Sequence, residues 1–363
     1  MRNKLTAMAM AVALLLSACD PAPAPSKGAT SGFAGLGGAQ QAFASVSPGA
    51  ALVFPRDHYA HPDYRIEWWY VTANLHDAQG NHYGVQWTLF RSALAPAADG
   101  PGWNNANLWL GHAGLTTATQ QYAAQRLGRG GVGQAGVAGE PWHAWIDDWT
   151  LASTARAGDP LQQLRVQARD AHFAYDLQLH SERPLVLQGE QGYSRKSDQG
   201  QASWYYSQPF LQARGQLTID GRTLDVEGSA WLDREWSSQY MAANQQGWDW
   251  FSLHLQGGRQ LMLFRLRHAD GRPYLSGNWI EADGRTQALQ AGDIELQPLM
   301  FSNIDGHQVP TAWSVKIPGK GLDIRTQPLN ERAWMGLATP YWEGPIRFVG
   351  SQEGEGYLEM TGY

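Results

Sequence analysis

Two carboxylates stand two residues apart in an aromatic-rich run, Ala230-Trp231-Leu232-Asp233-Arg234-Glu235-Trp236-Ser237. If the run is a strand, Asp233 and Glu235 share one face, because successive side chains of a strand point to opposite faces. Arg234 and Trp236 then share the other face. Like charges on one face push the two pKa values apart, which is one way to obtain an acid/base pair. The alternative is that each carboxylate forms an ion pair with an arginine.

Another carboxylate, Glu67, lies in the run Tyr64-Arg65-Ile66-Glu67-Trp68-Trp69-Tyr70. If Glu67 points inward together with Trp69, burial would raise its pKa and make it a candidate general acid. A structural salt bridge with Arg65 or another arginine is the first alternative, and a contact with a ligand is the second. The sequence leaves these three interpretations open.

Further aromatic residues gather near both carboxylate clusters, at Trp204-Tyr205-Tyr206, Trp248 and Trp250. Each of them alone is typical of a hydrophobic core. Together they predict an apolar cavity with a few polar groups, which is the usual anatomy of a small-molecule site.

Several familiar motifs give no support to other functions. The sequence contains no G-x-S-x-G and no H-E-x-x-H, so it offers no nucleophile elbow and no zinc motif of that kind. Residues 131–136 match G-x-G-x-x-G by letter, but no strand-to-helix pattern surrounds them, which argues against dinucleotide binding. His58 and His61 are flanked by Pro55 and Pro62, which favours hydrogen-bonded loop histidines over metal ligands.

The composition limits the class of protein. The 363 residues carry a net charge of -6, so a nucleic-acid partner is not expected. A single cysteine excludes a disulfide framework and any cysteine-based zinc or iron–sulfur centre. We therefore predict neither a metal nor an organic cofactor. The 17 tryptophans and 41 glycines favour β structure over helix.

Short alternating runs are the elements that must position the candidate residues. Residues 172–180 alternate apolar and polar side chains at a period of two. Residues 217–219 and 223–226 flank Asp220-Gly221, which is the signal of a hairpin with a type I′ turn. Long segments with a helical period do not occur in the sequence, so we expect an all-β sandwich or barrel.

A faint internal repeat indicates two domains. Residues 68–75 align without gaps with residues 248–255, and each copy is followed by Leu-Phe-Arg, at 89–91 and 263–265. Chance similarity between two hairpins is the alternative. The length also favours two domains. We place the N-terminal domain at residues 50–215 and the C-terminal domain at residues 216–363.

The first residues are typical of a secretion signal. A positively charged start precedes a 12-residue apolar run, Leu5 to Leu16, which is too short to span a bilayer comfortably. Leu16-Ser17-Ala18-Cys19 resembles a lipobox. We therefore expect residues 1–18 to be a lipoprotein signal peptide and Cys19 to be lipidated, with an ordinary secretory signal as the alternative.

The segment after Cys19 predicts where the protein resides. Residues 19–49 are rich in Pro, Ala, Gly and Ser, which is typical of a flexible tether. Acyl chains on Cys19 would anchor the chain to a membrane of the bacterial cell envelope, facing the periplasm. Asp20 resembles the signal for retention in the inner membrane.

The aromatic-rich segments, taken in order, resemble a known family. The matching stretches are residues 54–57, 61–62, 67–70, 86–91, 111–115, 145–149, 202–207, 231–236, 247–250 and 356–363. This pattern is similar to the lipocalin-like AttH family of predicted secreted hydrolases, which is related to carotenoid 1,2-hydratase (hydroxyneurosporene synthase). The resemblance covers nearly the whole chain after the tether.

The resemblance implies two lipocalin-like β-barrels in tandem with a ligand cavity. The hydratase branch adds water to a terminal isoprenoid double bond without metal or cofactor. Such a reaction needs an acid to protonate the alkene and aromatic walls to stabilise the carbocation, roles that the resemblance gives to Asp233, Tyr206 and Trp236. This chain departs from the hydratase branch at Arg234, since members of that branch have a histidine near this position. An arginine does not shuttle protons at neutral pH, so the departure puts hydratase chemistry in doubt for this chain.

Two functions follow, with a structural role in the envelope as a third. The first is a tethered protein that binds a lipid or isoprenoid-like molecule, as an accessory to an ABC transport permease that the AttH branch implies. The second is a cofactor-independent hydratase or hydrolase that uses carboxylates as acid and base. The candidate catalytic residues are Asp233, Glu235, Glu67 and Tyr206, and the candidate ligand-binding residues are His61, Trp69, His112, Tyr205, Arg234, Trp236, Trp248 and Trp250.

Overall fold

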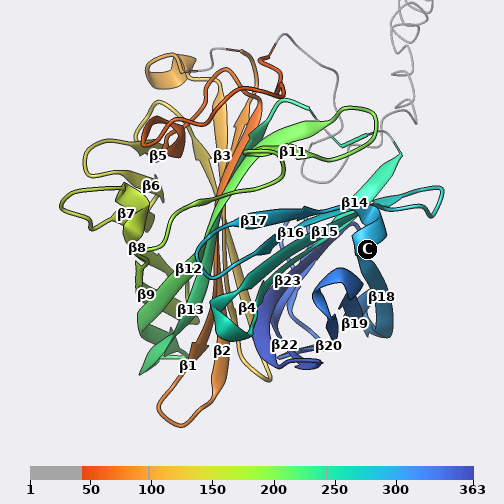
Figure 1. Ribbon diagram of the computed structural model, residues 1–363. Helices are drawn as coiled ribbons and strands as arrows, with labels where there is room; N and C mark the ends of the chain where they lie inside the picture. Colours follow the sequence, from red (N-terminus) through yellow and green to blue (C-terminus); the bar gives the residue numbers. More distant parts are fainter. Residues whose placement is uncertain (1–42, 97–98, 240, 243) are drawn as a thin grey trace, which may run out of the picture. The chain divides into compact units, whose positions relative to one another are not determined.

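The described residues form two antiparallel β-sheets, whose strands are linked by short connections and 3-10 turns (Figure 1). The computed structural model describes residues 43–96, 99–239, 241–242 and 244–363. All of them belong to one unit of contacts, Gly32–Tyr363. The first sheet is a nearly closed barrel and the second a half-barrel, so the prediction of an all-β fold with two lipocalin-like domains is confirmed.

The first sheet has the strand order β4-β3-β2-β1-β13-β12-β9-β8-β7-β6-β5, with β10 and β11 also paired to β12. Its strands are β1 Ile66–His76, β2 His82–Ala93, β3 Asn107–Thr116, β4 Gln121–Arg129, β5 Ala135–Ala138, β6 His143–Ile146, β7 Trp149–Ser153, β8 Gln163–Arg169, β9 Phe173–His180, β10 Val186–Leu187, β11 Tyr193–Arg195, β12 Ala202–Ile219 and β13 Arg222–Ser237.

The second sheet has the order β17-β16-β15-β14-β23-β22-β20-β19-β18, with β21 paired to β22. Its strands are β14 Gln245–His254, β15 Gln260–His268, β16 Tyr274–Ile280, β17 Thr286–Leu289, β18 Glu295–Ile304, β19 His307–Ile317, β20 Leu322–Pro328, β21 Trp334–Met335, β22 Tyr341–Gly350 and β23 Gly354–Thr361. The 3-10 turns are η2 Arg56–His58, η3 Gly102–Asn104, η4 Pro160–Gln162, η5 Gln256–Gly258, η6 Ala291–Asp293 and η7 Pro318–Lys320.

The hairpin between β12 and β13 has the predicted turn. Asp220 and Gly221 both have positive φ, 46° and 80°, as a type I′ turn requires. Because this turn folds β13 back onto β12, both strands belong to the first sheet. The chain therefore changes sheets between Ser237 and Gln245, whereas the predicted boundary at 215/216 falls inside β12.

Alternation along the strands separates three hydrophobic clusters. In β9 the alternate residues Phe173, Tyr175, Leu177 and Leu179 are buried in the first sheet's core, as their period of two predicts. A second cluster fills the concave side of the other sheet. A third cluster joins the two sheets, with Trp231 from β13 and Trp250 from β14 among its members.

The expectations for the N-terminal segment fall largely outside the described residues. The signal peptide, Cys19 and most of the tether lie in residues 1–42, which the structure does not describe. Within the described residues, no helix has the length and apolar character that crossing a bilayer would require.

Candidate active site

A cavity of about 200 Å³ lies between the two sheets, next to the third cluster. Strands β1, β2, β3, β12 and β13 of the first sheet and β14, β15, β22 and β23 of the second contribute side chains to its wall. The principal lining residues are Trp68, Tyr70, Phe90, Leu110, Lys196, Tyr205, Asp233, Glu235, Met241, Trp248, Trp250, Phe264, Leu266, Tyr341 and Glu359. The wall is therefore mostly aromatic and aliphatic, with a few acidic groups.

Asp233 of β13 is buried at this cavity and is bound by neutral donors. Ser207 Oγ and Trp231 Nε1 donate to Oδ1, at 2.5 and 2.6 Å, and the Tyr205 hydroxyl donates to Oδ2 at 2.7 Å. Burial raises the pKa of Asp233 to about 7, and these hydrogen bonds offset part of the rise. In the described part of the chain no basic side chain forms an ion pair with Asp233, so its carboxyl group exchanges a proton near neutral pH.

Glu235 lies on the same face of β13, as the strand pattern predicts, but in a different environment. Its Oε1 accepts a hydrogen bond from Ser203 Oγ at 2.5 Å and is 2.8 Å from the Lys196 ammonium group. The ammonium also lies over the rings of Tyr205 and Phe264, 4.9 and 4.4 Å from their centroids. The Lys196 cation is therefore placed against aromatic faces.

The second sheet contributes two further acids. Glu359 of β23 accepts a hydrogen bond from Trp248 Nε1 at 2.5 Å, and burial raises the pKa of Glu359 to about 7. Glu343 of β22 accepts a hydrogen bond from the Tyr70 hydroxyl of the first sheet, and burial raises its pKa well above the usual value. Asp233 and Glu359, one from each sheet, thus line the cavity with raised pKa values, and Glu343 is bonded to the lining residue Tyr70.

Glu67 borders the same cavity, but the prediction that burial raises its pKa is wrong. Its carboxylate accepts hydrogen bonds from His61 Nδ1 (2.6 Å), Arg234 Nη2 (2.6 Å) and Arg91 Nε (3.0 Å). Burial alone would raise the pKa of Glu67, but the two guanidinium groups and His61 outweigh it and hold the pKa well below its usual range. The salt-bridge alternative is the one that the structure shows.

The other face of β13 points into the first sheet and away from the cavity. There the Arg234 guanidinium lies 3.9 Å from the ring centroid of Trp69, and Trp236 stacks on His61 at 3.9 Å. Tyr206 is also buried on this side, with its hydroxyl 2.7 Å from His58 Nδ1. These five predicted site residues form a structural cluster around Glu67, because alternation turns them away from the lining set.

Three other predicted ligand-binding residues, Tyr205, Trp248 and Trp250, do line the cavity. His112 does not line the cavity itself, but its Nδ1 is 2.9 Å from the hydroxyl of the lining residue Tyr341. Burial lowers the pKa of His112 to about 4, so the ring is neutral at physiological pH.

A model of the AttH-like family matches residues 45–363. This chain belongs to the AttH-like family. The predicted relationship is therefore confirmed. No curated protein matches the chain.

Solved structures agree with the assignment. The AttH-like chain has 33% identity and a TM-score of 0.78 to a Nitrosomonas europaea protein designated AttH, over 88% of this chain and 99% of that one. It also resembles kievitone hydratase from Nectria haematococca (17% identity, TM-score 0.63, 88% and 96% covered) and CghA solved with Sch210972 (13%, 0.52, 89% and 96%). The last two likenesses concern the fold alone.

The two sheets of this AttH-like protein present equivalent residues to the cavity. Trp68 pairs with Phe90 on one side and Glu235 on the other, while Trp250 pairs with Phe264 and Glu359. By strand pairing Trp68 therefore corresponds to Trp250, two residues away from the Trp248 given by the ungapped sequence alignment. The two sheets share a strand topology, because in each sheet the first strand pairs with both the second strand and the last.

Sequence reasoning missed Glu359, Glu343, Tyr70 and Lys196 as site residues of the AttH-like protein. A signal for Glu359 existed in the closing segment, where Leu358 and Met360 alternate with it and fill the second sheet's core. A strand there sends Glu359 to the opposite face. Lys196 lies outside named strands and has no comparable pattern.

Proposed function

We propose that this protein is a cofactor-independent hydratase that adds water to a carbon–carbon double bond of a hydrophobic substrate, with Asp233 as general acid. The observation that carries the proposal is the Asp233 carboxyl, which is buried at an aromatic cavity, bound by neutral donors, and has its pKa raised to about 7. A general acid is most effective when its pKa lies near the working pH. The fold shared with kievitone hydratase supports the same class of reaction.

The proposed reaction starts with proton transfer from Asp233 to one alkene carbon, which leaves a carbocation on the other. Trp68 and Trp250 line the cavity, and their aromatic rings stabilise this positive charge. A water molecule then attacks the cation. Its excess proton passes to the Glu235 carboxylate, which is paired with Lys196, and returns to Asp233, so that atoms and charge balance over one cycle.

Binding without turnover is a second candidate function, favoured by the largely apolar wall of the cavity. In that case the acids orient a polar end of a lipid or isoprenoid-like molecule. We also keep the tethered location in this proposal, with Cys19 as the lipid anchor and an ABC permease as a partner. Replacement of Cys19 by Ser, followed by membrane fractionation, tests the anchor: a variant that still sediments with membranes would contradict it.

Turnover is tested with a panel of isoprenoid alkenes and prenylated aromatics in ¹⁸O-labelled water. Products that gain one labelled water are detected by mass spectrometry. We expect at least one substrate to be hydrated and Asp233→Asn to reduce the rate by about 10²–10⁴-fold, the usual contribution of a general acid. Asp225→Asn is the matched control, because Asp225 is an exposed carboxylate on the same strand.

Full turnover by the Asp233→Asn variant would exclude Asp233 as the acid. If no alkene is hydrated, native mass spectrometry together with lipid extraction tests the binding function. A hydrophobic molecule that co-purifies with both the wild type and Asp233→Asn supports that function. Protein that is empty and inactive on every substrate contradicts both candidates.

A further inference from the structure

Two histidines and a glutamate meet at the other end of the interface between the sheets. His76 ends β1 and pairs directly with His82, which begins β2, and Glu355 comes from β23 of the second sheet. One ligand atom from each of these three residues lies within 4.8 Å of the others. We propose that these three side chains bind a divalent transition-metal ion, with Zn²⁺ as the best fit to a His₂Glu donor set.

His82 carries the strongest observation for this site. The residue is more than nine-tenths buried, and within the described chain its Nδ1 has no hydrogen-bond partner. Its Nε2 lies 3.0 Å from Oδ1 of Asn74, which can only accept a hydrogen bond. The proton is therefore on Nε2, and Nδ1 presents a lone pair. Histidine ligands of metals are commonly held in this way by a second hydrogen bond.

The other two donors are already close to each other. His76 Nε2 is 2.9 Å from Glu355 Oε2, while tetrahedral zinc ligands lie roughly 3.3 Å apart. The two imidazole rings stack with centroids 4.7 Å apart. Because imidazole lone pairs lie in the ring plane, one ring must turn out of this stack before the three donors converge on one ion, and a fourth position is then left for water.

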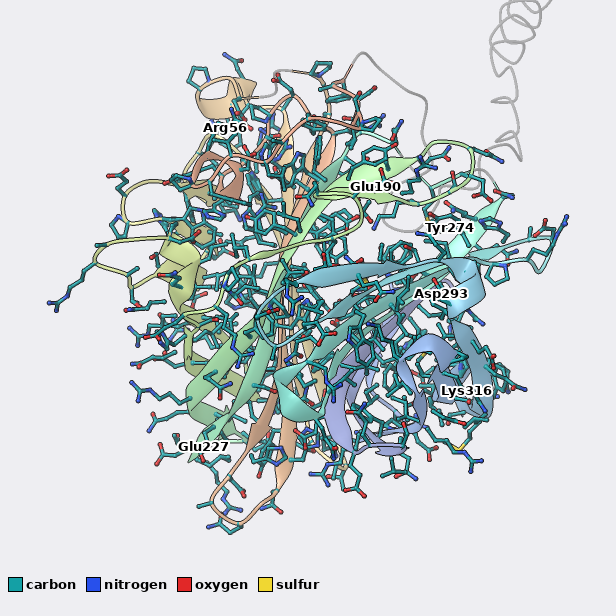
Figure 2. The ribbon with its side chains drawn as sticks, in the orientation of Figure 1. Arg56, Glu190, Glu227, Tyr274, Asp293 and Lys316 are labelled. Carbon is teal, nitrogen blue, oxygen red and sulfur yellow. The ribbon has the colours of Figure 1, made fainter. Side chains whose placement is uncertain are left out.

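The surrounding charges leave the donor atoms accessible. Arg347 is 3.4 Å from Glu355 Oε1 and so leaves Oε2 for a metal. Glu227 of β13, labelled at the lower end of the sheet in Figure 2, pairs with His76 on the other side, and His254 of β14 pairs with Glu355. These two neighbours add one formal negative charge and one further imidazole, so the carboxylates of Glu227 and Glu355 outnumber the one guanidinium of Arg347.

This site is separate from the proposed active site. Tyr70, at the cavity, and His76 are six residues apart on the same face of β1, which is roughly 20 Å in a strand. Because its ligands come from both sheets, a bound ion would join the β1–β2 hairpin to β23. The proposal therefore concerns stability of the interface and does not depend on hydratase activity.

The test uses the whole protein, stripped with a chelator and then titrated with Zn²⁺ or Co²⁺. We expect one equivalent of Zn²⁺ to bind against a chromophoric competitor, Co²⁺ to give visible d–d absorption, and Zn²⁺ to raise the melting temperature. His82→Ala and Glu355→Gln should each weaken Zn²⁺ binding by at least about 10-fold, and Asn74→Ala by about 10-fold or more through the orientation of His82.

His172→Gln is the matched control, because His172 is an exposed histidine beside a carboxylate, Asp220, far from this cluster in sequence. It should bind Zn²⁺ like the wild type. His76→Gln changes a partly exposed ligand, so it replaces the His82 variant as the test of Zn²⁺ binding if that variant does not fold. The proposal is overturned if wild type binds no Zn²⁺, or if affinity and the Co²⁺ spectrum are unchanged in the folded His76, His82 or Glu355 variants.

Discussion

At the scale of single residues, Asp233 and Glu67 show how one physical condition gives opposite results. Both carboxyl groups are buried at the same cavity. Glu67 is bound by two guanidinium groups and a histidine, so it stays charged and fixed, whereas the donors to Asp233 are two hydroxyl groups and an indole. The sign of the pKa shift depends on the charge of the partners and not on burial alone.

Asp233 should make stability depend on pH. The pKa of Asp233 is about 7 in the folded protein and near 4 when unfolded, so its contribution is fully present below pH 4 and is lost as pH rises through 7. Asp233→Asn removes this titration. Between pH 5.5 and 8, the free energy of unfolding measured in urea should therefore fall less for the variant than for the wild type, by on the order of 1–2 kcal/mol.

The control for this pH effect is again Asp225→Asn, which should keep the wild-type slope. Glu359 has a pKa raised to about 7 for the same reason and contributes in the same direction, so Glu359→Gln should also flatten the slope. Parallel slopes for wild type and both site variants would contradict the raised pKa values.

At the scale of elements, alternation along β13 assigns its residues to two different tasks. Asp233 and Glu235 face the cavity, and Arg234 and Trp236 face the interior of the first sheet. One strand therefore supplies both the proposed acid and the guanidinium that fixes Glu67. A change of register by one residue would exchange the two faces.

The contact between β2 and β22 sets how closely the two sheets approach. In Figure 1 the blue strands β22 and β23 lie beside the orange strands β1 and β2. A Cβ on Gly84 would be 2.5 Å from Cδ of Pro345, a ring that cannot rotate away. We expect Gly84→Ala to reduce the free energy of unfolding by about 1–3 kcal/mol, as overpacking does.

Gly292→Ala is the matched control for this substitution, because a Cβ there would meet no described atom within 4 Å. Its unfolding midpoint should stay close to wild type. A Gly84→Ala protein as stable as this control would show that the sheets can move apart without cost.

At the scale of the whole molecule, the site exists because two sheets share one hydrophobic cluster. That cluster takes Tyr70, Tyr205 and Trp231 from the first sheet, together with Val186 and Phe210, and its remaining members from the second. The cavity wall likewise needs both sheets. Separating them would expose contiguous aromatic surface, which soluble monomers seldom do.

We therefore expect fragments 45–239 and 240–363 to depend on each other. Expressed alone, each should aggregate or lack a cooperative unfolding transition, and co-expressed they should purify as a 1:1 complex. Size-exclusion chromatography and thermal unfolding measure this. A monomeric fragment 45–239 with a sharp transition of its own would show that the shared cluster is dispensable.

Much of the local structure could be predicted from the sequence. The period of two gave the buried face of β9 and the division of β13, and Asp220-Gly221 gave a type I′ turn, because these features depend on neighbouring residues alone. The family and the two-sheet fold could also be predicted, since the aromatic-rich segments match the family pattern in order along the chain.

The chemical state of each acid was decided by the tertiary structure. Glu67 is fixed by Arg234, 167 residues away, and the cavity combines Asp233 with Glu359 from the other sheet. The metal-ligand cluster likewise joins His76 to Glu355, 279 residues along the chain. The sequence determined which residues lie on which face of a strand, but pKa values and ligand sets depend on which faces meet, and long-range packing alone decides that.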